Sequence, residues 1–328
     1  MGGKSYLQAR VIFVTRNVGS LSSTAVFIHD YVASITNTWR GKPGSCRLHP
    51  KLQPVTDVSI AVFLPPQLLA HVRHVFLSEA EFYVASSWKD VDEIVRREPL
   101  DVLILDPAAD GVVNVDAVAG LLNAFPSLPV VGYVMLNPNS FGAIAQLSRR
   151  GLTHVVLHRF GDSRERLQAT ISRVRTHPPS ARLLNMMAPA LRRVPLSLTR
   201  AVADMFEKPH RYGSVLDLAM TAQLPPVSVY RYLEGAKLTS PKKLLIAAKM
   251  SRGLTYLRDP GYSVADVANK LGYSHPRIFS AHALEVFEET PSRLRRRVSE
   301  EDATATLLRW ISVSTMPVKG SMSILGHQ

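Results

Sequence analysis

Between residues 57 and 175, short runs of apolar residues alternate with longer amphipathic stretches. Strands are predicted for the apolar runs at 58–64, 81–86, 101–106, 128–136 and 154–158. Helices are predicted for the stretches at 66–78, 88–97, 114–124, 139–150 and 162–175. Apolar strands that alternate with helices are typical of a parallel sheet covered on both faces. The pattern therefore predicts an α/β doubly wound domain of the flavodoxin-like kind.

A helical pattern occupies residues 214–298. Ser263 can cap a helix whose apolar positions recur every three or four residues until Gly272, and Ser274 can begin a second helix. Upstream, a helix at 215–222, a second at about 226–236 and a long one from 240 to about 257 follow the same rules. Two short helices joined by a tight turn, repeated once, predict an all-α tandem helix-turn-helix domain.

These patterns divide the chain into five segments. Residues 1–56 show no sustained period and are expected to be a poorly ordered extension. The α/β domain spans 57–175, a helical connector 176–213, the helix-turn-helix domain 214–300 and a tail 301–328.

The distribution of charge along the chain indicates which of these segments binds a polyanion. The net charge is +13, and residues 176–300 hold 19 Lys and Arg against 10 Asp and Glu. Residues 57–175 hold 11 basic against 13 acidic residues. A mildly acidic α/β domain joined to a basic helical domain is typical of a regulatory part attached to a part that binds a polyanion.

The residues of the second unit resemble a known family. SVADVANKLGYSHPRIFS, followed by TPSRLR with Thr290, Pro291, Ser292 and Arg295, looks like the second helix-turn-helix of the AraC/XylS transcription regulators. The resemblance implies two recognition helices that enter successive major grooves, roughly 34 Å apart. The chain departs from the family at Ala283 and Leu284, where a Phe-Lys pair is usual, and at Glu288, where Gly is usual.

The resemblance also implies which side chains reach DNA, because the start of each recognition helix faces the base edges. In the first unit the candidates are Ser228, Tyr230 and Arg231, with Lys237, Lys242 and Lys243 as phosphate contacts. In the second unit they are Ser274, His275, Arg277, Ser280 and His282. Arg277 is the strongest candidate for a base contact, since arginine can donate two hydrogen bonds to guanine.

The α/β domain resembles the receiver domain of response regulators, most closely in PLDVLILDP and RRGLTHVVLHRF. Asp106 stands where the family has its phosphoacceptor. The first strand, however, runs into Leu64 and two prolines, where the family has acidic residues that hold a cation. Val134 and His158 stand in place of its hydroxyl residue and lysine. We therefore expect a degenerate receiver-like domain that serves association or signal input without phosphorylation.

The leading hypothesis is a bacterial, sequence-specific transcription regulator of AraC type that binds double-stranded DNA. Two alternatives stay open: a protein-interaction adaptor with degenerate DNA reading, and a response regulator phosphorylated at Asp106. A homodimer through the receiver-like domain and RNA polymerase are further expected partners.

The remaining sequence features argue against an enzyme and against a membrane protein. The sequence has no HExxH, GxSxG or P-loop pattern, so we expect no enzyme, cofactor or metal. No apolar run is long enough to suggest a membrane span. The single Cys46 is compatible with a reducing cytoplasm, the expected location.

Overall fold

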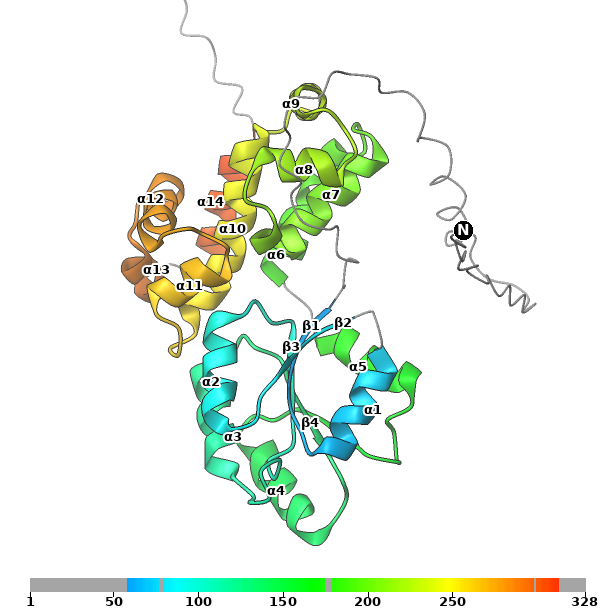
Figure 1. Ribbon diagram of the computed structural model, residues 1–328. Coiled ribbons are helices and arrows are strands. Elements are labelled where there is room, and N and C mark those ends of the chain that lie inside the picture. The colour runs from blue at the N-terminus through cyan, green and yellow to red at the C-terminus, as the bar shows by residue number, and fades with distance from the viewer. Residues whose placement is uncertain (1–57, 77–79, 175–177, 298, 313–328) are drawn as a thin grey trace, which may run out of the picture. The chain divides into compact units, whose positions relative to one another are not determined.

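The computed structural model describes residues 58–76, 80–174, 178–297 and 299–312. The extension expected over residues 1–56 lies outside this range, and so does the end of the expected tail. We call residues 58–174 the sheet domain and residues 178–312 the helical domain; Figure 1 shows both.

The sheet domain contains five parallel strands in the order β2-β1-β3-β4-β5. The strands are β1 (Val58–Phe63), β2 (Ala80–Val84), β3 (Val102–Leu105), β4 (Val130–Val134) and β5 (His154–Leu157). This order is that of the flavodoxin-like doubly wound fold, so the predicted fold class is confirmed. β3 and β4 are buried along their whole length, which explains why their sequences are continuously apolar.

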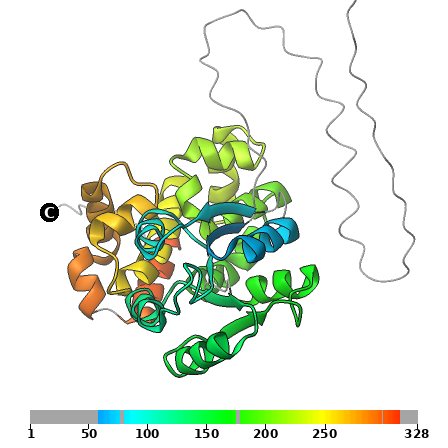
Figure 2. The same ribbon diagram turned by 60° about the horizontal axis from the view of Figure 1, so that its bottom comes forward.

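Five helices cover the sheet: α1 (Pro66–Phe76), α2 (Trp88–Arg97), α3 (Val115–Ala124), α4 (Pro138–Arg149) and α5 (Arg164–Val174). Successive side chains of β1 point to opposite faces of the sheet. Ile60 and Val62 pack with α1 and α5, whereas Ala61 and Phe63 pack with α2, α3 and α4. Figure 2 shows the same arrangement of helices from another side.

The helical domain is built around one long helix, α10 (Pro241–Arg258), which is buried over most of its length. Its neighbours are α6 (Pro178–Leu191), α7 (Leu196–Glu207), η1 (Pro209–Arg211), α8 (Val215–Thr221), α9 (Pro226–Gly235), α11 (Val264–Lys270), α12 (Pro276–Phe287), α13 (Pro291–Arg297) and α14 (Glu300–Ile311). All nine contact α10. Helices α6 and α7 lie in the segment expected to be a connector, and both pack against α10.

Helix α14 lies in the segment that the sequence analysis left as a tail. Ala303, Leu307 and Ile311 recur at helical spacing and are at most 2% exposed, because they pack against α10, α12 and α6. An isolated antiparallel bridge also joins Ser312 to Leu238, just after α9. The end of the described chain therefore contributes to the core of the helical domain.

Candidate nucleic-acid interface

The first helix-turn-helix unit consists of α8 and α9. Ser214 begins α8, and its backbone N–H donates a hydrogen bond of 2.8 Å to the carboxylate of Asp217. Gln223, at φ 54°, makes the turn between the helices. Pro226 starts α9 at a position where a backbone N–H would have no partner in the helix. Leu233 anchors the inner face of α9, which leaves the opposite face exposed.

The second unit consists of α11 and α12. Ser263 and Asp266 form the reciprocal capping box at the start of α11. Gly272 makes the turn at φ +70°, and a Cβ atom there would lie 2.7 Å from the carbonyl oxygen of His210. Glycine is therefore required both for the backbone angle and for the close approach of η1. Phe279, 1% exposed, anchors α12 in the domain.

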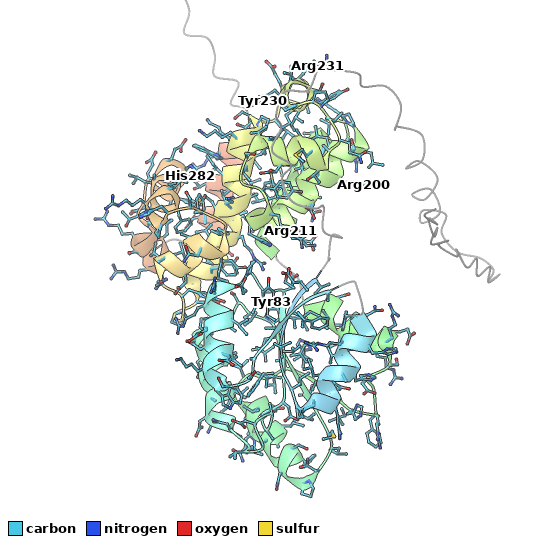
Figure 3. The ribbon with its side chains drawn as sticks, in the orientation of Figure 1. Tyr83, Arg200, Arg211, Tyr230, Arg231 and His282 are labelled. Carbon is cyan, nitrogen blue, oxygen red and sulfur yellow. The ribbon has the colours of Figure 1, made fainter. Side chains whose placement is uncertain are left out.

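Helices α9 and α12 both contact α10 and lie on either side of it in Figure 1. Figure 3 labels Tyr230 and Arg231 on the first of these helices and His282 on the second. Most of the predicted DNA-contacting residues therefore lie in or next to these two helices, whereas Lys242 and Lys243 belong to α10. Two separate recognition helices are one condition for reading two segments of one duplex.

Several of the predicted contact residues have exposed side chains. Tyr230 is 46% exposed, and its neighbour Arg231 is exposed with its guanidinium 5.5 Å from the centre of the Tyr232 ring. The others with exposed side chains are Lys237, Lys242, Lys243, Ser274, His275 and Arg277. These side chains can reach a ligand without rearrangement of the domain.

Some predicted residues are partly engaged within the domain. His275 is the N-cap of α12, because its Nδ1 atom accepts a hydrogen bond of 3.1 Å from the backbone N–H of Arg277. Ser280 donates to the carbonyl oxygen of Pro276, and Ser228 is half-buried. The ring nitrogen Nδ1 of His282 lies 3.0 Å from the hydroxyl of Tyr273. Burial lowers the pKa of His282, which favours the neutral ring.

Lys243 has a partner that its position in the sequence does not indicate. Its ammonium lies 4.5 Å from the centre of the Trp310 ring, and the Trp310 indole donates a hydrogen bond of 3.3 Å to its carbonyl oxygen. Trp310 belongs to α14, so Lys243 fastens that helix to the start of α10. A cation over an aromatic ring keeps its full charge, so Lys243 can still attract phosphate while its side chain is held in place by Trp310.

Two further cations lie near the interface, of which Lys249 escaped the sequence analysis and Arg295 was named there only as part of the family motif. Lys249 is 5% exposed on α10, with its ammonium 4.7 Å from the centre of the Tyr273 ring, and burial lowers its pKa. Arg295, the last residue of the TPSRLR motif, donates from Nη2 to the carbonyl oxygen of Tyr262 at 2.6 Å. This hydrogen bond ties α13 to the loop before α11.

The candidate phosphoacceptor lies in the sheet domain at the end of β3. The Asp106 carboxylate accepts a hydrogen bond of 2.9 Å from the backbone N–H of Ala108, and burial raises its pKa. It lines a cavity of about 390 Å³ together with Pro65, Met135, Asn137 and Ser140. Among the described residues that line this cavity, Asp106 is the only one that carries a charge.

His158, which stands where the receiver family has its lysine, is bound to other side chains. Its Nδ1 atom lies 2.7 Å from a carboxylate oxygen of Asp162 and 2.9 Å from the hydroxyl of Tyr133. Tyr133 also donates to Asp162 at 2.7 Å, and this bond helps to lower the pKa of Asp162 to about 2 despite burial, which opposes the shift. His158 thus completes a buried network instead of lining the Asp106 cavity.

The described residues hold neither a metal-binding cluster nor a membrane-spanning helix. In residues 58–76, 80–174, 178–297 and 299–312, no three His, Cys, Asp or Glu side chains are grouped closely enough to hold a metal ion. Within the same ranges, no helix has both the length and the apolar character needed to cross a membrane.

Comparison with known proteins gives three kinds of match. Residues 218–297 match the family model described as a helix-turn-helix domain. The Msm operon regulatory protein of Streptococcus mutans is 27% identical over 107 residues, which are 31% of this chain and 38% of that protein. The chain therefore spans well under half the length of this relative.

Two solved structures are weakly similar. Full-length FixJ from B. japonicum has 11% identity and a TM-score of 0.33, covering 61% of this chain and 99% of that one. The xylose-binding transcription activator XylR also has 11% identity, with a TM-score of 0.26, covering 73% of this chain and 70% of that one.

The sequence motif, the two capped helix pairs around α10 and the matched family model all fall on the same residues. The sheet domain has the strand order of a receiver, with Asp106 at the end of β3. Residues 218–297 are thus a helix-turn-helix domain whose motifs resemble the AraC type, and they follow a sheet domain with the strand order of the flavodoxin-like fold.

Proposed function

We propose that this protein is a transcription regulator that binds a specific sequence of double-stranded DNA through α9 and α12. The observation that carries the proposal is the pair of capped helix-turn-helix units on either side of α10. Arg231 projects from the first recognition helix and Arg277 from the second, and both are exposed. A single chain can then read two segments of one duplex from successive major grooves.

Within this interface, the residues take different roles. Arg277 contacts a base in the segment read by α12, and Tyr230 and Arg231 contact the segment read by α9. Lys237 and Lys242, both exposed, contact phosphates and fix the register. His275 acts mainly as the cap that orients the start of α12, since its Nδ1 atom is occupied by the Arg277 backbone.

The test is selection of preferred duplexes from a random pool with the full chain. The expected result is a motif in two parts, about one helical turn apart, whose enrichment falls steeply as salt rises. Arg277→Ala should relax the preference in one part at a cost of roughly 1–3 kcal/mol, and Arg231→Ala should do so in the other. Lack of any enriched motif with the wild-type chain at low salt would refute DNA reading.

We further propose that the sheet domain acts without phosphorylation of Asp106. The support is chemical: phosphoryl transfer to a carboxylate needs a cation held by further acidic groups, and the cavity offers only the Asp106 charge. Magnesium-dependent labelling of the wild-type chain by a small phosphodonor, abolished in Asp106→Asn, would contradict this proposal.

An adaptor function is favoured by a different observation. Leu216, Met220 and Val227 on α8 and α9 are 55%, 64% and 80% exposed, which gives the first unit an apolar surface that a protein partner could cover. The same selection experiment decides between the two functions. A DNA regulator retains its two-part motif when Val227 is changed to Thr, whereas an adaptor yields no motif at all.

A further inference from the structure

The sheet domain and the second helix-turn-helix unit meet in a contact rich in polar links. Helix α2 packs against α11, and the turn after α3 lies against the turn between α10 and α11. The backbone N–H of Gly261 donates to the carbonyl oxygen of Ala124 at 2.7 Å, and the guanidinium of Arg96 donates to the carbonyl oxygen of Gly261. We call this set of interactions the α2/α11 contact.

Lys270 is a deeply buried charge in the α2/α11 contact. It is 1% exposed, and its ammonium donates at 2.7 Å to the carbonyl oxygen of Val95 and also to that of Glu98. Both acceptors belong to the C-terminal end of α2, where carbonyl groups have no partner in the helix and the helix dipole is negative. A residue of the DNA-reading unit therefore caps a helix of the sheet domain.

Asp259 makes a second buried link, in the turn between α10 and α11. It is 1% exposed, and its carboxylate accepts hydrogen bonds from the backbone N–H and the hydroxyl of Ser127 at 3.1 Å and 2.5 Å. Burial lowers the pKa of Lys270 to about 7 and raises that of Asp259 to about 6. If the domains moved apart without admitting water, both groups would lose these hydrogen bonds while still buried. The loss of hydrogen bonds by a buried charged group is costly.

The consequence for DNA reading follows from how the second unit is built. Helix α11 packs against α12, so whatever fixes α11 also fixes the recognition helix. Resting on the proposed DNA-reading function, we propose that the sheet domain is a positioning element of the second unit: through Lys270 and Asp259 it holds α11, and hence α12, in the orientation that reads DNA.

Gly261 allows the contact to be opened without a change inside the helical domain. The three atoms nearest to a Cβ built there all belong to the sheet domain: Cε1 and Cζ of Phe125 at 2.4 and 2.6 Å, and the carbonyl oxygen of Ala124 at 2.7 Å. Gly261→Ala therefore requires the Phe125 ring and the Ala124 backbone to shift away from the turn between α10 and α11, which opens the contact. The matched control is Gly120→Ala on α3, where an added Cβ meets nothing within 4 Å.

The experiment uses the full chain and two measurements. Hydrogen exchange reports whether α11 has been released, and binding to the selected duplex, with each half scrambled in turn, reports discrimination at each half. Arg231→Ala and Arg277→Ala assign the halves to α9 and α12. Gly261→Ala should speed exchange in α11 and lower discrimination at the α12 half by roughly 5- to 150-fold, the usual range for coupled sites, with the α9 half unchanged.

The other results are equally decisive. Gly120→Ala should leave both measurements as in the wild type. The positioning role is refuted if hydrogen exchange in α11 does not rise in Gly261→Ala. It is also refuted if this exchange rises while both halves of the duplex are still discriminated equally well. In either case the DNA-reading function stands. Absence of a selected motif with the wild-type chain would refute both. If Gly261→Ala fails to fold, Ser127→Ala, which removes one hydrogen bond to Asp259, should show the same changes at smaller size.

Discussion

Glu288 gives a prediction in which backbone geometry and charge can be separated. It ends α12 in the left-handed conformation, at φ 58° and ψ 17°, with its N–H bonded to the carbonyl oxygen of Leu284. A residue with a Cβ atom pays roughly 1–2 kcal/mol for this conformation, whereas glycine does not. Glu288→Gly should therefore raise the free energy of unfolding by about 1 kcal/mol, once the greater entropy of glycine in the unfolded chain is subtracted.

The same residue carries a negative charge next to the proposed DNA-reading helix. Glu288→Gly and Glu288→Ala both remove that charge, but alanine keeps the unfavourable backbone conformation. We expect both variants to bind the selected duplex more tightly than the wild type, with the gain shrinking as salt rises. Only the glycine variant should gain stability, with a midpoint of thermal unfolding about 2–4 °C higher.

Urea unfolding and duplex titration at two salt concentrations measure the two effects. Equal stability of the glycine and alanine variants would show that the left-handed conformation costs nothing here. Unchanged affinity in both variants would show that the end of α12 lies away from the DNA. Either result would refute the corresponding part of the reasoning.

Three further predictions concern single residues. Lys242→Ala should weaken binding to all duplexes alike and reduce the slope of log affinity against log salt by about 1, which titration at several salt concentrations measures. Burial lowers the pKa of His210 to about 4 from an ordinary value of 6.5, so stability should be complete above pH 6.5 and fall by roughly 3 kcal/mol as pH drops to 4. Urea unfolding of His210→Gln should lack this loss, and an unaltered profile would exclude His210 as its source. Leu307→Ala should lose about 2–5 kcal/mol of unfolding free energy because this side chain is 1% exposed, and a loss below 1 kcal/mol would show that α14 is not part of the core.

The order of elements could be predicted from the sequence because each signal is local. Val102–Leu105 is continuously apolar and short, and the structure has it as a strand buried on both faces. Ser263 and Gly272 begin and end α11 through interactions with nearby residues and through a backbone angle. Such signals do not depend on which distant segment packs against the element.

The contact partners of individual side chains could not be predicted, because these partners lie far away along the chain. Lys243 resembles any exposed lysine at the start of a helix, and its partner Trp310 lies 67 residues later. Lys270 follows the apolar positions of α11 and looks like an ordinary last-turn lysine. Its two acceptors lie more than 170 residues earlier, in the sheet domain.

The position of the α2/α11 contact also limits how a signal could reach the DNA-reading unit. Asp106 lies at the carboxyl end of its strand, whereas the C-terminal ends of α2 and α3 lie near the amino ends of the strands. Helix α3 follows the loop that lines the Asp106 cavity and ends at Ala124, whose carbonyl group binds Gly261. At 1.5 Å per residue, its ten residues span about 15 Å. If the sheet domain positions α11 as proposed, a ligand in the cavity need only shift α3 along its axis to alter how α12 meets DNA.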